Sequence, residues 1–97
     1  MIIPAVIAHG GAGPGPSRQA NLELAIKKAA DILISGGNAL DAAVQACVIL
    51  EDDPVFNAGT GSVMRTDGSI LTDASIQTGD GKVGFVIAME DTPNPIL

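Results

Sequence analysis

The chain has 97 residues, 46% of them hydrophobic and 16% charged, which argues against disorder and favours one small domain or a part of one. Eleven acidic residues against five basic ones give a net charge of −6, which disfavours binding to nucleic acid or to an anionic membrane surface. Phe56 and Phe85 are the only aromatic residues, so the core must be built mainly from Ala, Val, Ile and Leu, with close backbone approach at the alanines.

The cysteine, histidine and apolar patterns exclude several further classes. A single cysteine, Cys47, cannot form an intrachain disulfide, and its apolar neighbours favour a small buried side chain over a reactive thiol. One His and one Cys do not make a zinc site. No stretch is apolar for long enough to span a membrane, and the first residues lack a signal-peptide pattern. We therefore expect a cytoplasmic protein with no membrane partner.

The chain opens with an apolar run, residues 2–8, which is rich in β-branched residues and predicts a buried strand. It ends at a glycine cluster that begins with His9, Gly10 and Gly11. The cluster lacks both Gly-Lys-Ser/Thr and the GxGxxG spacing, so phosphate binding is a minor alternative. It indicates either a turn with positive φ or a loop whose backbone approaches a reacting centre closely. We interpret His9 as an orienting hydrogen-bond partner rather than a general base.

Two helices are expected next. Over residues 18–35 the apolar residues fall on one face, and Gly36-Gly37 supplies the left-handed residue that commonly follows a helix. Asn38 has the character of an N-cap, with Asp41 at the capping-box position, and predicts a second helix over 39–51. This second helix is apolar nearly all round, so we expect it to be covered on every side.

The second half of the sequence alternates turn signals with short apolar runs. After an irregular loop at 51–62, turns are expected at 66–68 and 79–81. The segments expected to be extended are 62–65, 69–73 with its continuation 74–77, and 83–89. The element order is then β-α-α-β-β-β, which predicts an α/β protein with helices stacked on an antiparallel or mixed sheet.

Three consecutive acids, Glu51, Asp52 and Asp53, close the second predicted helix. Acidic side chains are unfavourable at the negative end of the helix dipole, and their spacing does not match an EF-hand. A bound cation or a specific turn would resolve this conflict. Asn57, which is flanked by small residues, is either a turn residue or an amide aimed into a site.

Four segments together resemble a known family. They are the HGGAG run at 9–13, GNALDAA at 37–43, LEDDPVFNAGTGS at 50–62 and LTDASI at 71–76. These motifs, in this order, resemble the N-terminal part of the plant-type asparaginases and isoaspartyl aminopeptidases, which are N-terminal nucleophile hydrolases. The resemblance implies an αββα sandwich, of which residues 1–97 form the N-terminal, α-subunit portion of a single domain. It also implies hydrolysis of L-asparagine, of β-aspartyl dipeptides, or of both.

In this family the nucleophile is a Thr that self-cleavage makes the first residue of a β chain, and its own α-amino group is the general base. All five Thr of the present chain are internal and outside the family's cleavage context: Thr60, Thr66, Thr72, Thr78 and Thr92. The oxyanion hole and the groups that bind the substrate's α-amino and α-carboxylate groups also belong to the β chain. The resemblance therefore implies a β-subunit partner, an (αβ)2 assembly and a small-molecule substrate. We expect residue 97 to be a truncated or clipped end.

The resemblance assigns roles to particular residues. Asn57 resembles the Asn that orients the nucleophilic Thr, and His9, Gly10 and Gly11 resemble the Gly-rich loop beside it. Six main-chain carbonyls resemble the ligands of a structural sodium ion, those of Leu50, Glu51, Asp53, Phe56, Ala58 and Thr60. No organic cofactor is expected. The alternative interpretation is a non-catalytic fragment or a structural cation-binding module.

Overall fold

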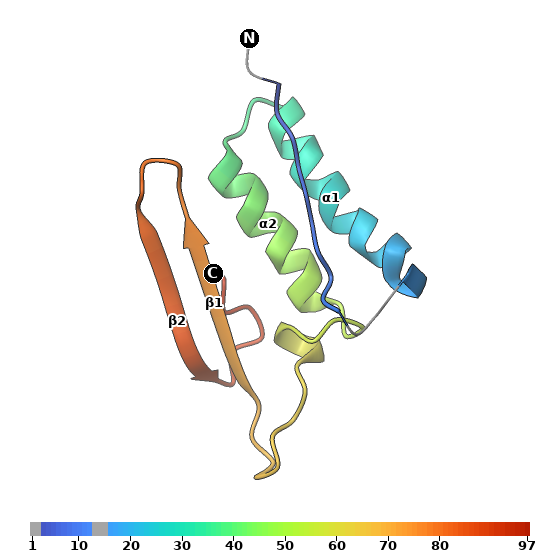
Figure 1. Cartoon of the computed structure of the whole chain (residues 1–97), viewed down its shortest axis with the longest axis vertical. Helices are drawn as coiled ribbons and strands as arrows, with labels where there is room; N and C mark the ends of the chain where they lie inside the picture. Colours follow the sequence, from blue (N-terminus) through green and yellow to red (C-terminus); the bar gives the residue numbers. More distant parts are fainter. Residues whose placement is uncertain (1–2, 13–15) are drawn as a thin grey trace.

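Two helices side by side and a two-stranded hairpin form the regular structure in the computed structural model, which describes residues 3–12 and 16–97 (Figure 1). The elements, in chain order, are η1 (Pro16–Arg18), α1 (Gln19–Ile34), α2 (Ala39–Asp52), η2 (Gly59–Gly61), β1 (Leu71–Gln77) and β2 (Val83–Glu90). α1 and α2 run antiparallel, and the hairpin lies on the far side of α2 from α1 (Figure 1). Within the described residues, neither helix combines the length and the apolar character needed to cross a membrane.

The helix pair confirms the two predicted helices and their boundary signals. The Gly36 N–H donates to the Leu33 carbonyl (3.2 Å) and the Gly37 N–H to the Ile32 carbonyl (2.9 Å), with Gly36 at φ +89°. This is the Schellman pattern, which closes α1 by satisfying its last carbonyls. The Asn38 Oδ1 then accepts the Asp41 N–H at 2.8 Å and begins α2.

The buried helical contact is built from small residues: Ala25 and Ala29 of α1 and Ala42 of α2. Side chains of this size let the two helix backbones approach closely. The expectation that α2 is covered on every side is only partly correct. Every residue from Val44 to Leu50 is half-buried, because α1 and η2 pack against only part of the circumference of α2.

The hairpin confirms the predicted strand at 69–73 from Leu71 onward, its continuation at 74–77, the strand at 83–89 and the turn between them. β1 and β2 pair antiparallel, and the Thr78 N–H closes the turn on the Lys82 carbonyl at 2.9 Å. The register is interrupted near Asp73, whose Oδ1 accepts the Ala88 N–H at 2.6 Å. Ala88 lies at φ +54°, so the side chain of Asp73 holds a bulge in the ladder.

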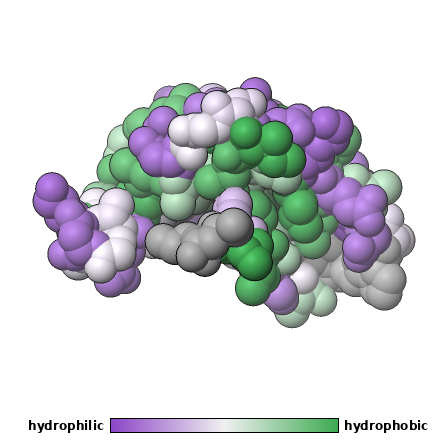
Figure 2. Space-filling model, turned by 90° about the horizontal axis from the view of Figure 1, so that it is seen from above, coloured by the Kyte–Doolittle hydropathy of each residue, from purple (hydrophilic) through white to green (hydrophobic). Residues whose placement is uncertain are grey.

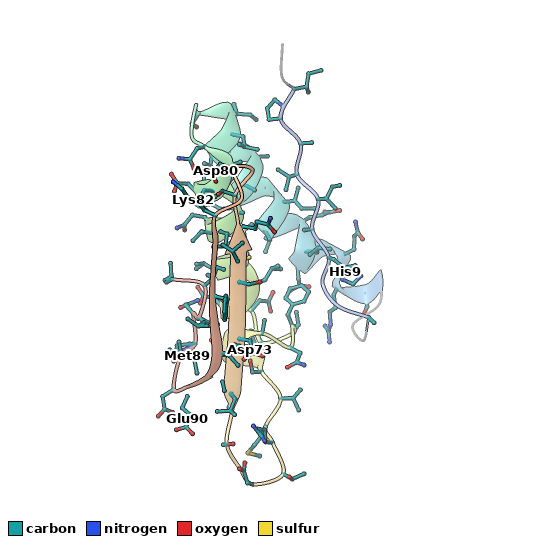
Figure 3. All side chains as sticks on the ribbon, turned by 60° about the vertical axis from the view of Figure 1, so that its left-hand side comes forward. His9, Asp73, Asp80, Lys82, Met89 and Glu90 are labelled. Atoms are coloured by element: carbon teal, nitrogen blue, oxygen red, sulfur yellow. The ribbon has the colours of Figure 1, made fainter. Side chains whose placement is uncertain are left out.

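The predicted first strand is wrong within the described residues. Ile2 lies outside them, and residues 3–8 form no strand, with Ile3 and Ile7 82% and 96% exposed. A strand exists only where a neighbour accepts its backbone hydrogen bonds. Figures 1 and 3 both place this segment away from the hairpin, which holds the strands of the described residues.

The predicted strand at 62–65 is also wrong. The turn at 66–68 is present, since the Arg65 N–H donates to the Ser69 carbonyl at 2.8 Å, but strand β1 begins only at Leu71. The reason is a competing bond: the Val63 N–H donates to the Asn57 side chain and is directed toward the preceding loop. The observed order is α-α-β-β, which is compatible with one helical layer and part of one sheet of the expected sandwich.

Candidate functional site

The Gly-rich segment and the loop that follows α2 meet at an open cavity of about 400 Å³. One wall is formed by the segment from His9 to Ala12, and the other by Leu50 and the segment from Phe56 to Ala58. These two stretches lie about 45 positions apart in the sequence, and they contain both groups of residues that we singled out as catalytic. The fold therefore places His9, Gly10, Gly11 and Asn57 around one space.

The Gly-rich segment contacts the loop closely at one point. A Cβ atom on Gly10 would lie 2.8 Å from Cε1 of the buried Phe56 ring, so a larger residue does not fit there. Gly11 adopts φ +96°, and its N–H donates to Nδ1 of His9 at 3.0 Å. With Nδ1 acting as an acceptor, the neutral His9 ring carries its proton on Nε2. The positive φ of Gly11 confirms the turn interpretation of the glycine cluster, and the close approach at Gly10 is to the ring of Phe56.

His9 is exposed, and its hydrogen bond stays within its own loop. Figure 3 shows it on the opposite side of the molecule from Asp73 and Met89 of the hairpin. The described structure places no nucleophilic side chain against it. The hydrogen bond that His9 makes is to the Gly11 N–H of the same loop.

The two polar atoms of the Asn57 side chain differ: Oδ1 is hydrogen-bonded within the described residues and Nδ2 is not. Its Oδ1 accepts the Val63 N–H at 2.9 Å, which fixes the orientation of the amide. Its Nδ2 makes no hydrogen bond to the described residues, and the side chain lies at an exposed position on the cavity. An amide held by its oxygen with a free N–H₂ is arranged to donate a hydrogen bond to a group in the cavity.

The loop after α2 releases carbonyl groups from the helix. Pro54 has no N–H, so the carbonyl of Leu50 has no helical partner. In a continuing helix the Val55 N–H would donate to the carbonyl of Glu51, but here it donates to Oδ1 of Asp53 at 3.1 Å. Two of the carbonyls predicted to face a cation have thus lost their helical bonds.

Glycines allow this loop to fold tightly. A Cβ atom on Gly59, which has φ +49°, would lie 2.2 Å from the Pro93 carbonyl oxygen and 2.6 Å from that of Glu51. A Cβ atom on Gly61 would lie 2.1 Å from the carbonyl oxygen of Phe56. The carbonyls of Glu51 and Phe56 therefore point inward, toward the glycines of η2.

Main-chain oxygens are the donors that this loop offers to a cation. In the part of the chain that the structure describes, no three His, Cys, Asp or Glu side chains form a metal-binding group. The carbonyls of Asp53 and Ala58 each accept one N–H, from Phe56 and Gly61 respectively, and each keeps a second lone pair. Main-chain oxygens are ligands that hard cations prefer.

The acidic side chains of this loop have structural partners. Oδ2 of Asp53 accepts Nδ2 of Asn21 at 2.9 Å, which ties the loop to α1. Glu51 is only 6% exposed, and its carboxyl accepts hydrogen bonds from Nδ2 of Asn94 and from the Ile96 N–H, each at 3.2 Å. Burial raises the pKa of Glu51, and these two hydrogen bonds act in the opposite direction.

Sequence reasoning missed the role of the Glu51 side chain, because its partners lie 43 and 45 residues further along the chain. The signal that could have found it was the unfavourable position of an acid at a helix C-terminus. Cys47, one turn earlier, is half-buried, and burial followed by the charge of Glu51 raises its pKa. This agrees with a small packed side chain rather than a reactive thiol.

A second hollow of about 620 Å³ lies beyond Gly59, beside Thr60, Ser69, Thr72 and the end of β2. It holds several hydroxyl groups, but that of the buried Thr72 already bonds the Thr92 carbonyl at 3.2 Å. Thr60 is the only predicted site residue among its lining residues.

Residues 2–97 match the model of a protein family described as asparaginase. The chain belongs to this asparaginase family. It is 48% identical to the isoaspartyl peptidase/L-asparaginase of Macaca fascicularis and 46% identical to that of Homo sapiens, over 96% of this chain and 32% of each relative. It is 39% identical to the plant-type L-asparaginase of Pyrococcus horikoshii, over 95% of this chain and 32% of that relative.

These matches confirm the resemblance drawn from the four motifs. The chain spans about a third of the length of the curated asparaginase relatives that it matches.

Proposed function

We propose that this chain is the α-subunit part of a threonine-nucleophile amidohydrolase that hydrolyses L-asparagine, β-aspartyl dipeptides, or both, after self-cleavage. The observation that carries the proposal is the cavity in which the Gly-rich segment faces Asn57, whose amide oxygen is held while its N–H₂ group is free. The isoaspartyl peptidase/L-asparaginase names of the relatives support the same reaction class.

The chemistry divides between two polypeptides. A companion β chain supplies the N-terminal Thr, whose hydroxyl attacks the side-chain amide of the substrate. The α-amino group of that Thr, with an ordinary pKa of about 7.7–8.0, takes the hydroxyl proton and gives it to the ammonia or amine that leaves as the C–N bond breaks. Water then hydrolyses the resulting Thr ester and frees the enzyme. This chain supplies orientation: Nδ2 of Asn57 donates to the Thr, and Gly10 and Gly11 let the Gly-rich segment turn and lie against Phe56 at the same cavity. Fixing a nucleophile in this way lowers the barrier by removing unproductive orientations.

A structural sodium ion belongs to the proposal. It would be held by the carbonyls of the 50–60 loop, of which those of Leu50 and Glu51 lack helical partners. The ion would stabilise the loop that carries Asn57. Because the ligands are main-chain oxygens, Asp52→Asn should leave the sodium-dependent rise in melting temperature nearly unchanged. Loss of that rise in the Asn variant would show that side chains ligate the ion.

An (αβ)2 assembly and a cytoplasmic location complete the proposal. The division of the site between two kinds of chain requires one α and one β chain, and the pairing of two such units is what the family resemblance implies. The single cysteine, which can form no intrachain disulfide, agrees with a reducing compartment.

The test is complementation. The chain alone should not release ammonia from L-asparagine or cleave a β-aspartyl dipeptide, and a companion chain that begins with Thr should restore turnover. In that assembly Asn57→Ala should lower kcat about a hundredfold. Asn57→Asp is the sharper variant, because it keeps the oxygen that accepts the Val63 N–H and replaces the free donor with a charged acceptor oxygen.

Both Asn57 variants should be slow if the donor orients Thr. Near-normal turnover in the Asp variant would show that Asn57 only holds the loop through its bond to Val63 and does not orient the Thr. Turnover by the verified chain without a companion would overturn the division of labour. The alternative, a non-catalytic cation-binding module, predicts sodium-dependent stability and no turnover with any Thr-led companion.

A further inference from the structure

Glu51 is a buried acid whose carboxyl joins two distant parts of the chain. Its oxygens accept Nδ2 of Asn94 and the backbone N–H of Ile96, both at 3.2 Å. The same Nδ2 group also donates to Oδ1 of the exposed Asp52 at 2.9 Å. After β2 the chain turns back toward the end of α2 (Figure 1), and these bonds hold the 94–96 segment there.

The 57–61 loop, which carries Asn57, contacts both the end of α2 and the segment after β2. A Cβ atom built on Gly59 would lie 2.2 Å from the carbonyl oxygen of Pro93 and 2.6 and 2.7 Å from the carbonyl oxygen and Cβ of Glu51. Pro93 directly precedes Asn94, and Gly59 is two residues beyond Asn57. Any shift of the 93–96 segment relative to α2 therefore changes the space in which this loop is seated.

A carboxyl group buried to this extent is costly unless its hydrogen bonds are made. An apolar side chain of similar volume would avoid that cost, but it would leave the Ile96 N–H and the Asn94 amide without their acceptor. Burial of the carboxyl therefore lowers the stability of the fold, and its hydrogen bonds define how the 94–96 segment meets the end of α2.

We propose that Glu51 is a positioning residue: its carboxyl clamps the 93–96 segment to the end of α2 and thereby sets the position of the 57–61 loop and of Asn57. The effect on catalysis rests on the proposed function of this chain. The effect on the loop does not, so the two can be measured separately.

Four hydrogen-bonded amides report on the loop directly: those of Phe56, Gly61, Ser62 and Val63. Their exchange with deuterium is measured in the full chain, and kcat and KM for L-asparagine are measured with the Thr-led companion. The test variant is Glu51→Gln, which keeps one acceptor oxygen and loses the other. Asp52→Asn is the matched control, since it removes the same charge from the neighbouring exposed acid and keeps its oxygen. Ala29→Gly is the control for general destabilisation, in a buried part of α1 away from the loop.

Glu51→Gln should speed exchange of the four amides about tenfold and lower kcat about tenfold, with KM changed less than twofold. Asp52→Asn and Ala29→Gly should leave loop exchange and kcat at wild-type values. If Glu51→Gln does not fold, Asn94→Ala removes one of the two groups that the Glu51 carboxyl holds and should loosen the same four amides.

Wild-type loop exchange in Glu51→Gln, or in Asn94→Ala where that variant is used, would overturn the proposal. So would an Ala29→Gly variant of equal melting temperature that shows the same loop loosening and the same loss of kcat, because the role would then be general stability. Absence of turnover in the wild-type assembly would refute the proposed function instead, and the exchange measurements would still decide on the clamp.

Discussion

The two phenylalanines of the chain lie in opposite environments. Phe56, in the irregular loop after α2, is 3% exposed and lies against Gly10, whereas Phe85, in the regular strand β2, is 68% exposed. Val83 and Ile87 alternate with Phe85 along the strand and are also exposed, and Figure 2 shows hydrophobic side chains at the surface of the molecule. Regular backbone hydrogen bonding and burial are therefore separate properties here. The loop without regular structure is the better packed of the two regions.

The largest difference should appear when each ring is removed. Phe56→Ala should lower the free energy of unfolding by about 4 kcal/mol, because it leaves a cavity between the loop and the Gly-rich segment. Phe85→Ala should change it by less than about 0.5 kcal/mol, since the ring is already hydrated. Urea unfolding of the full chain measures both. Equal losses would show that the hairpin contributes to the core as much as the loop does.

Adding a methyl group to a glycine sharpens the same comparison. Gly61→Ala should cost about 3 kcal/mol, because the new Cβ would collide with the Phe56 carbonyl oxygen. Gly84→Ala, in β2, should cost little, since the nearest atom to its Cβ is Cγ2 of Ile76 at 4.0 Å. Melting temperatures of the two variants provide the measurement. A normal Gly61→Ala variant would contradict the tight loop described above.

The smallest effect is expected at the turn that joins the two regions. The side chain and backbone N–H of Ser69 donate to the exposed carboxylate of Asp67 and lower its pKa below the ordinary value of 3.8. A lowered folded-state pKa contributes stability at higher pH that is lost as pH falls through that pKa. At about pH 5, Asp67→Asn should therefore have a lower free energy of unfolding than wild type. This difference should shrink as the pH is lowered below the ordinary pKa of 3.8. A stability difference that does not change with pH would contradict this contribution.

Much of the local structure was predictable because its partners are close in the sequence. The cap at Asn38, the glycine end of α1 and the turns at 66–68 and 79–81 are each closed by hydrogen bonds that span at most five residues. Such signals need only the residues beside them. The family, too, was recognisable from four short motifs, and its match over residues 2–97 confirms that recognition.

The strands were harder to predict, because a strand forms only when a second segment pairs with it, and a local sequence pattern does not identify that segment. Residues 3–8 carry a strand-like composition but form no strand in the structure, whereas 83–89 carries a similar composition and pairs with β1. At 62–65 the alternative partner was Asn57, whose side chain takes the Val63 N–H. An apolar, β-branched run indicates the capacity to pair, and the rest of the chain decides whether pairing occurs.

By itself, the sequence determined the helices, their caps, the turns and the chemistry of the residues available to a site. The tertiary structure decided which of these residues meet: Gly10 with Phe56, the Gly-rich segment with Asn57, and Glu51 with Asn94 and Ile96. The physical reason is distance along the chain. Caps and turns are closed by short-range hydrogen bonds, whereas a buried carboxyl and a glycine packed against a ring depend on partners more than 40 positions away, which only the folded arrangement brings into contact.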